Sequence, residues 1–165
     1  MDDAMSTPLE PATEAFWRQY LDAAPDATAA QRWFYESFRI GTSVESSNEG
    51  ALLISRGIKT TTSSLLWEYE AEHKPLPQVG SLSILKDGHE QAVCVVETTE
   101  LVTRAFRDVD ARFAYDYGEW DRTLKTWRHE CWRFYAAQCE TLGREPAPTM
   151  PLVCERFRVV YGGKS

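Results

Sequence analysis

Two apolar runs joined by a short polar turn place the strongest constraint on the fold of this chain. The runs are "SLSIL" at residues 81–85 and "AVCVVETTEL" at 92–101, with "KDGHEQ" between them. Both runs contain β-branched residues, and Asp87-Gly88 is a turn signal, so the pattern predicts a β-hairpin. A third run, "LVCERFRVVY" at 152–161, predicts a strand near the C-terminus.

Apolar residues at helical spacing lie on both sides of these strands, so the chain is expected to be an α+β domain built on a curved or closed mixed sheet. Residues 1–10 are expected to form a flexible tail, and 11–165 a single domain. The predicted helices are 14–23 with Thr13 as cap, 27–38, 48–56 with a capping box of Ser46 and Glu49, 109–117 opened by Asp108, and 122–142 with Asp121 as cap.

The composition limits the class of protein. The chain has 165 residues, 43% of them hydrophobic, and a net charge of −7, which suits a globular domain and disfavours a dedicated duplex-DNA binder. It has no secretory signal and no apolar run long enough to span a membrane, so we expect a cytoplasmic protein. The four cysteines form no Cys-x-x-Cys pair, which predicts buried free thiols and neither a metal nor a cofactor.

An unbroken row of hydroxyl residues follows a single lysine in "RGIKTTTSSLLWEYE" (56–70). In a regular strand Lys59 and Thr62 point to opposite faces, so they can meet only if the strand has not begun at Lys59. Gly57 tolerates a left-handed backbone and makes such a junction possible. The alternative is a simple strand start, because threonine favours strands and a lysine after a helix complements its dipole.

A carboxylate lies within the second strand of the predicted hairpin. Glu97 shares a strand face with Val93, Val95 and Leu101. A charge among apolar neighbours is costly unless it is paired, and Lys59 is the candidate partner. The alternative is that the strand frays at Glu97 and the carboxylate is solvated.

Five segments resemble the ASCH domain family, whose fold is similar to that of the PUA domain. They are "GIKTTTSSLLWEYE", "PLPQVGSLSIL", "CVVETTEL", "DRTLKTWR" and "VCERFRVVY", and the resemblance covers roughly residues 33–161. It implies a β-barrel flanked by helices, with a cleft lined by the lysine junction. The chain differs from short family members in being longer and in having two additional N-terminal helices.

The family resemblance implies a connection with RNA. Some members bind single-stranded RNA, some resemble ribonucleases, and a short-chain branch hydrolyses the acetyl amide of N4-acetylcytidine. That branch uses a lysine, a threonine and a glutamate, which match Lys59, Thr62 and Glu97. The sequence "KTTTSS" lacks the arginine that often follows the threonine in that branch.

Basic and aromatic residues supply a possible surface for nucleic acid. Arg122, Lys125, His129 and Arg133 share one helical face and are called the basic stripe below. The stripe is either a phosphate track or an ordinary solvated face, and each Trp is either a stacking platform or part of the core. The residues assigned to RNA binding are Ser64, Trp67, Trp120, Arg122, Thr123, Lys125 and Arg128.

Three functions therefore compete. The first is a cleft that binds single-stranded RNA and hydrolyses it in the manner of a ribonuclease. The second is an amidohydrolase acting on an N4-acylated cytidine-type nucleoside, and the third is a non-catalytic RNA-binding module. An open groove continuous with the basic stripe would favour RNA, whereas a closed pocket would favour a small substrate.

Overall fold

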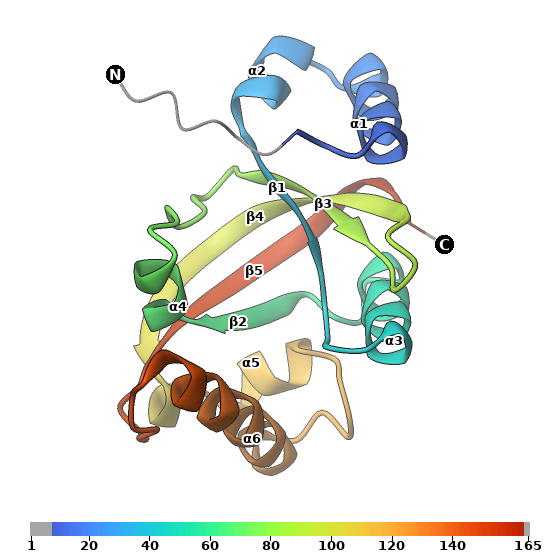
Figure 1. The fold of residues 1–165 in the computed structure, drawn as a ribbon. Coiled ribbons are helices and arrows are strands. Elements are labelled where there is room, and N and C mark those ends of the chain that lie inside the picture. The colour runs from blue at the N-terminus through green and yellow to red at the C-terminus, as the bar shows by residue number, and fades with distance from the viewer. Residues whose placement is uncertain (1–7, 164–165) are drawn as a thin grey trace.

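The structure is a computed structural model that describes residues 8–163 of the chain. It contains one five-stranded sheet surrounded by helices (Figure 1). The strands are β1 (Phe34–Arg39), β2 (Thr61–Leu65), β3 (Leu82–Lys86), β4 (Ala92–Ala105) and β5 (Pro151–Gly162). The helices are α1 (Pro11–Ala23), α2 (Ala27–Arg32), α3 (Val44–Ser55), α4 (Leu66–Ala71), α5 (Ala111–Asp116) and α6 (Leu124–Leu142), with a 3-10 turn η1 (Phe106–Asp108).

The sheet is mixed and curled into a half-barrel. Its strand order is β1-β3-β4-β5-β2, with β1 parallel to β3 and the other pairs antiparallel. Helices α1 and α2 lie at one end of the sheet, and α5 and α6 lie at the other (Figure 1). The expected α+β class with a mixed, curved sheet is therefore confirmed, and so is the β3–β4 hairpin. In its turn, Asp87 Oδ1 accepts hydrogen bonds from the backbone N–H groups of His89 and Gln91.

The N-terminal helices differ from the prediction at two points. α1 begins at Pro11, which suits the first turn of a helix, and Thr13 is buried inside it instead of capping it. The predicted helix over 27–38 is wrong in its second half, because α2 ends at Arg32 and Phe34–Arg39 forms β1. Residues 1–7 of the predicted tail lie outside the described residues.

The caps of the later helices are also displaced from their predicted positions. α3 has its capping box at Ser43 and Ser46, not at Ser46 and Glu49. α5 is capped by Asp110 instead of being opened by Asp108. α6 starts at Leu124 with Thr123 as its cap, so neither Asp121 nor Arg122 belongs to the helix.

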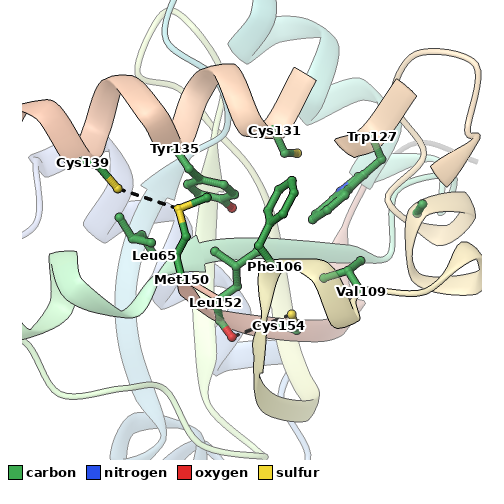
Figure 2. Packing of buried hydrophobic residues seen from close by; sticks show 11 residues of the cluster. Leu65, Phe106, Val109, Trp127, Cys131, Tyr135, Cys139, Met150, Leu152 and Cys154 are labelled. Carbon is green, nitrogen blue, oxygen red and sulfur yellow. Dashed lines mark hydrogen bonds between the residues drawn. The ribbon is translucent and has the colours of Figure 1, made fainter. Parts of the chain in front are cut away.

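The core of the described chain consists of three clusters, each of which packs different helices against the sheet. Trp17 and Tyr20 of α1 pack on β3 and β4, and Ala51 and Ile54 of α3 pack on the same two strands and on β5. The third cluster joins α5 and α6 to β2 and β5 (Figure 2). Its large members include Trp127, which stacks on Phe106 with ring centroids 5.4 Å apart. The four cysteines are buried and free, as predicted.

Candidate active site

The hydroxyl residues that precede and begin β2 attach this strand to α5. Because β2 starts at Thr61, Lys59 and Thr60 lie in the junction between α3 and β2, as the argument from spacing required. The N–H and Oγ1 of Thr60 both donate to the carbonyl of Asp116, at 2.8 and 3.4 Å. Thr61 Oγ1 donates to the carbonyl of Phe113 at 3.1 Å. The junction is therefore fixed against helix α5.

The side chain of Lys59 is buried and has a carboxylate partner. Its Nζ lies 2.9 Å from Glu119 Oε2 and donates to the carbonyl of Tyr117 at 3.2 Å. The same ammonium lies 3.1 Å from the centroid of the Tyr117 ring, which is a cation–π contact. Burial lowers the pKa of Lys59, and the Glu119 carboxylate offsets part of this effect because it favours the ammonium. The Lys59 side chain is 0% exposed and that of Glu119 is 23% exposed, so the pair reaches solvent through its carboxylate.

Glu119 lies on a loop with unusual backbone geometry. Gly118, Trp120 and Arg122 have φ angles of 75°, 56° and 64°. A Cβ at Gly118 would lie 2.8 Å from Lys59 Cα, so a side chain there would push the loop away from the lysine junction. Left-handed conformations at non-glycine residues cost free energy and cluster at functional sites. The loop therefore holds Glu119 in a defined position against Lys59.

A cavity of about 650 Å³ lies between the sheet and helices α3, α4 and α6. Thr62, Ser63 and Ser64 of β2 line it, as do Glu119 and Trp120 of the loop before α6. Lys59 does not line the cavity, but its partner Glu119 does. Thr62 and Glu119 therefore share one cavity, whereas Lys59 contacts Glu119 and Tyr117 from outside its lining.

A second carboxylate lies beside Thr62 in this cavity. Glu155 on β5 is the cross-strand partner of Thr62 on β2, and both residues line the cavity. Cross-strand partners lie next to each other on one face of a sheet. Glu155 Oε1 accepts a hydrogen bond of 2.6 Å from Oγ1 of the buried Thr98. Burial raises the pKa of Glu155, and the hydrogen bond from Thr98 opposes that rise.

Other carboxylates of the cavity wall have partners of their own. Lys74 Nζ donates to Glu36 Oε2 at 2.6 Å, and Gln138 Nε2 donates to Glu68 Oε2. Burial raises the pKa of Glu68, and the hydrogen bond from Gln138 lowers it. The first pair ties the segment after α4 to β1, and the second ties α4 to α6.

The cavity is strongly acidic. Its only basic lining residues within the described chain are Arg39 and Lys74, against seven glutamates. An anionic group such as a phosphate meets a repulsive potential in such surroundings. The charge balance thus favours a ligand that is uncharged or positively charged. The seven residues are Glu36, Glu49, Glu68, Glu72, Glu119, Glu130 and Glu155.

Glu97 lies outside this site, and its predicted pairing with Lys59 is wrong. Glu97 Oε2 accepts hydrogen bonds of 2.9 and 2.7 Å from Nε and Nη2 of Arg158, its cross-strand partner on β5. Glu97 does not line the cavity, whereas Lys59 is paired with Glu119. The physical reason is that Arg158 lies directly opposite Glu97 in the sheet and neutralises it at the surface.

The residues assigned to RNA binding do not all line the cavity. Ser64 and Trp120 line the cavity, and the Trp120 ring is stacked on Tyr117 with a centroid separation of 5.9 Å. Trp67 packs instead against the core cluster of α6, with the guanidinium of Arg144 4.5 Å from its ring centroid. The remaining four, which do not line the cavity, are Arg122, Thr123, Lys125 and Arg128.

The basic stripe is interrupted and turned away from the cavity. Arg122 precedes α6, and its Nε donates to the carbonyl of Tyr115 at 2.8 Å. Lys125, His129 and Arg133 are exposed on α6. By helical spacing they lie opposite the α6 residues that line the cavity, which include Cys131, Tyr135 and Gln138. None of the stripe residues lines the cavity, although Arg133 Nη1 lies 3.8 Å from Oε2 of Glu130, which does.

The part of the chain that the structure describes contains no cluster of side chains suited to bind a metal ion. No group of three or more His, Cys, Asp or Glu side chains there is arranged to hold a metal ion. Cys131 lines the cavity, but burial raises the pKa of its thiol to about 12, so it remains protonated at neutral pH. Within residues 8–163, no helix has the length and apolar character needed to cross a membrane.

The curled sheet, its flanking helices and a cavity beside a buried lysine define a PUA-like α+β domain. The ASCH domain model matches residues 36–161, which is most of the chain. The protein belongs to the ASCH domain family, a PUA-like family associated with RNA. The resemblance inferred from the five sequence segments is thereby confirmed.

Two crystal structures resemble the whole chain and not only the matched segment. The ASCH domain from Lactobacillus crispatus JV V101 has 28% sequence identity and a TM-score of 0.88, covering 94% of this chain and 98% of its own. A protein from Enterococcus faecalis V583 has 29% identity and a TM-score of 0.79, covering 90% of this chain and 88% of its own. Among curated proteins, none matches this sequence.

Two residues of the site were not predicted from the sequence. Glu119 lies in the short segment between Gly118 and the "DRTLKTWR" motif, and Glu155 lies inside the "VCERFRVVY" strand. The only available signals were a carboxylate next to a helix-breaking glycine and a charge within an apolar strand. The second signal is the same one that drew attention to Glu97.

Proposed function

We propose that the protein hydrolyses the amide of an N4-acylated cytidine-type nucleoside in this cavity. The observation that supports it most is the buried Lys59–Glu119 ion pair at 2.9 Å, whose carboxylate shares the cavity with Thr62. The family resemblance implies a lysine, a threonine and a glutamate for this reaction. In this proposal Glu119 has the catalytic role that the family resemblance had implied for Glu97.

The size and charge of the cavity support a nucleoside more than an RNA chain. Its volume of about 650 Å³ falls in the range of roughly 300–1,000 Å³ that small-molecule sites occupy. The seven glutamates of its wall disfavour phosphate groups, and an uncharged nucleoside avoids this repulsion. The aromatic pair of Tyr117 and Trp120 offers a flat surface on which a base can stack.

Each of the three residues has a role that follows from its surroundings. Thr62 Oγ1 is the nucleophile that attacks the amide carbon, and Glu119 accepts its proton. Lys59 is too deeply buried to contact the substrate, so it is a positioning residue that holds Glu119 and supplies a fixed positive charge. After the amine leaves, water hydrolyses the acyl–threonine ester and releases the carboxylic acid.

The experiment is a turnover assay with N4-acetylcytidine, in which chromatography follows the release of cytidine. We expect the native protein to release cytidine, and Thr62→Ala and Glu119→Gln to lower the rate by about 10²–10⁴-fold. Glu97→Gln is the matched control, because it removes the same charge outside the cavity, and its rate should equal that of the native protein. A native protein without turnover, or a Glu119→Gln variant with full activity, would overturn the proposal.

Binding of single-stranded RNA is the second candidate. It is supported by Trp120, a cavity residue that is 47% exposed and stacks on Tyr117. A single unstacked base could occupy this position while its phosphates stay outside the acidic wall. A labelled oligoribonucleotide tests this candidate: it predicts binding that weakens in Trp120→Ala, and equal binding by both proteins would refute it.

A further inference from the structure

Glu155 differs from Glu119 in having no cationic partner. The ion pairs formed within residues 8–163 do not include Glu155, although it lines the cavity. Glu119, in contrast, is held 2.9 Å from the buried ammonium of Lys59. Glu119 and Glu155, which both line the cavity with Thr62, thus have opposite environments. Such a pair is the arrangement by which active sites assign one carboxyl group as base and another as acid.

The groups around Glu155 favour its protonated form. Burial raises its pKa, and the nearby carboxylate of Glu36 raises it further. Thr98 donates a hydrogen bond to it, and Lys74 lowers its pKa, but the ammonium of Lys74 is already paired with Glu36 at 2.6 Å. The phenol of Tyr69 also faces this region from α4, and burial raises its pKa, so it adds no charge at neutral pH.

The position of Glu155 is fixed from two sides. It pairs with Thr62 across the β2–β5 ladder, and Thr98 on β4 holds its Oε1 at 2.6 Å. Glu155 and Thr62 both line the cavity as cross-strand neighbours. A ligand whose amide carbon lies against Thr62 Oγ1 places its nitrogen within the same small region.

We propose that Glu155 is the general acid of the reaction and protonates the nitrogen that leaves. The inference rests on the proposed function of the cavity. Thr62 Oγ1 forms a bond to the amide carbon and its proton passes to Glu119. The C–N bond then breaks, its electron pair stays on the nitrogen, and the nitrogen takes the proton of Glu155 and departs as a neutral amine.

The second half of the reaction restores both carboxyl groups. Water forms a bond to the acyl carbon and gives a proton to Glu155, which is now a carboxylate. The bond between the acyl carbon and Thr62 breaks, and Thr62 regains its proton from Glu119. The balance is one amide and one water consumed, and one carboxylic acid and one amine formed.

A comparison of two leaving groups separates this role from a structural one. An amide nitrogen needs a proton in order to leave, whereas p-nitrophenolate leaves without one. We therefore expect Glu155→Gln to slow N4-acetylcytidine hydrolysis by about 10²–10⁴-fold and to leave nearly unchanged the initial burst of p-nitrophenolate from p-nitrophenyl acetate, which reports acylation of Thr62 alone. Thr62→Ala is the matched control, because it removes the nucleophile and should slow both substrates.

The results of these assays distinguish the acid role of Glu155 from the proposed function of the cavity. Equal losses on both substrates, or no loss on the amide, would overturn the acid role while native turnover still supports the proposed function. An absence of native turnover would overturn both. Carbon-13 NMR of glutamate-labelled protein, with Glu155→Gln used to assign the signal, provides a test that needs no turnover. A Glu155 carboxyl that titrates at or below its ordinary value of 4.5 would overturn the acid role.

Discussion

Lys59 and Glu119 form an ion pair whose two ends differ in their access to water. Nζ and Oε2 lie 2.9 Å apart, with the lysine side chain 0% exposed and the glutamate 23% exposed. If the pair is broken, the carboxylate can turn toward the cavity, but the ammonium has no route to solvent. Removing the carboxylate and removing the ammonium should therefore lower the free energy of unfolding by different amounts.

This asymmetry predicts the order of stability in a double-mutant cycle. Glu119→Gln leaves a buried ammonium without its counter-charge, and we expect it to lower the free energy of unfolding by about 3–5 kcal/mol. Lys59→Met should cost less, because the remaining carboxylate can be hydrated. The double variant should be more stable than Glu119→Gln alone. Urea denaturation at neutral pH measures all three, and additive effects would contradict the prediction.

The surface pair of Glu97 and Arg158 is the control for that cycle. Arg158 has a side chain that is 67% exposed, so its ion pair is largely solvated. We expect Arg158→Ala to change the free energy of unfolding by at most about 1 kcal/mol.

Gly118 should be far less tolerant of a side chain than Gly143. Both have left-handed backbones, with φ of 75° and 69°, and an alanine in this conformation costs about 1–2 kcal/mol. At Gly118 the new Cβ would also lie 2.7 Å from the carbonyl oxygen of Ile58, whereas at Gly143 nothing lies within 4 Å. Gly118→Ala should therefore lose more stability than Gly143→Ala, and it alone should lower turnover, because it displaces Glu119. Thermal unfolding and the turnover assay check this, and equal effects at the two positions would argue against it.

Glu155 should make the folded protein less stable as the pH rises. Its pKa is raised in the folded state, so the folded protein holds more protons than the unfolded chain above the ordinary value of 4.5. The free energy of unfolding then falls as the pH increases from that value through the raised pKa. Glu155→Gln should flatten this slope and be more stable than the native protein at neutral pH. Urea denaturation across this range is the measurement, and the remaining slope should include Glu68, whose pKa is also raised.

The basic residues of α6 should not affect turnover of a nucleoside. Lys125 and Arg128 do not line the cavity, so Lys125→Ala combined with Arg128→Ala should leave kcat and KM unchanged. If RNA does bind this face, the slope of log affinity against log salt should flatten by about 0.7 for each phosphate that the variant no longer neutralises. A rise in KM for the uncharged nucleoside would show that these side chains reach the site.

The sequence predicted the structure correctly where the residues of one segment determine its conformation. Gly57 has a φ of 73°, and β2 begins only at Thr61, so the junction that frees Lys59 from strand geometry followed from the glycine and the spacing. The β3–β4 hairpin likewise followed from Asp87 and the flanking strand residues. Both are features of contiguous residues.

The predictions were wrong or missing where the structure of a residue depends on a segment far away in the sequence. Phe34 and Phe38 have the spacing of a helix face, but parallel pairing with Leu82 and Leu85 makes that segment β1. Glu97 was expected to need Lys59 because nothing in the sequence shows that Arg158 lies opposite it. Glu119 gave no periodic signal, since its position depends on a loop that packs against a junction far away in the chain.

The cavity is built from nearly the whole length of the chain. Its walls run from Tyr35 on β1 to Phe157 on β5, and they include residues of the helices between them. A molecule bound there contacts the first and the last strand at once, so its binding free energy opposes unfolding of the entire domain. At a concentration of one hundred times Kd this adds about 2.7 kcal/mol, which raises the melting temperature by several degrees. A set of modified nucleosides can thus be ranked by thermal shift, including compounds that the protein binds without converting.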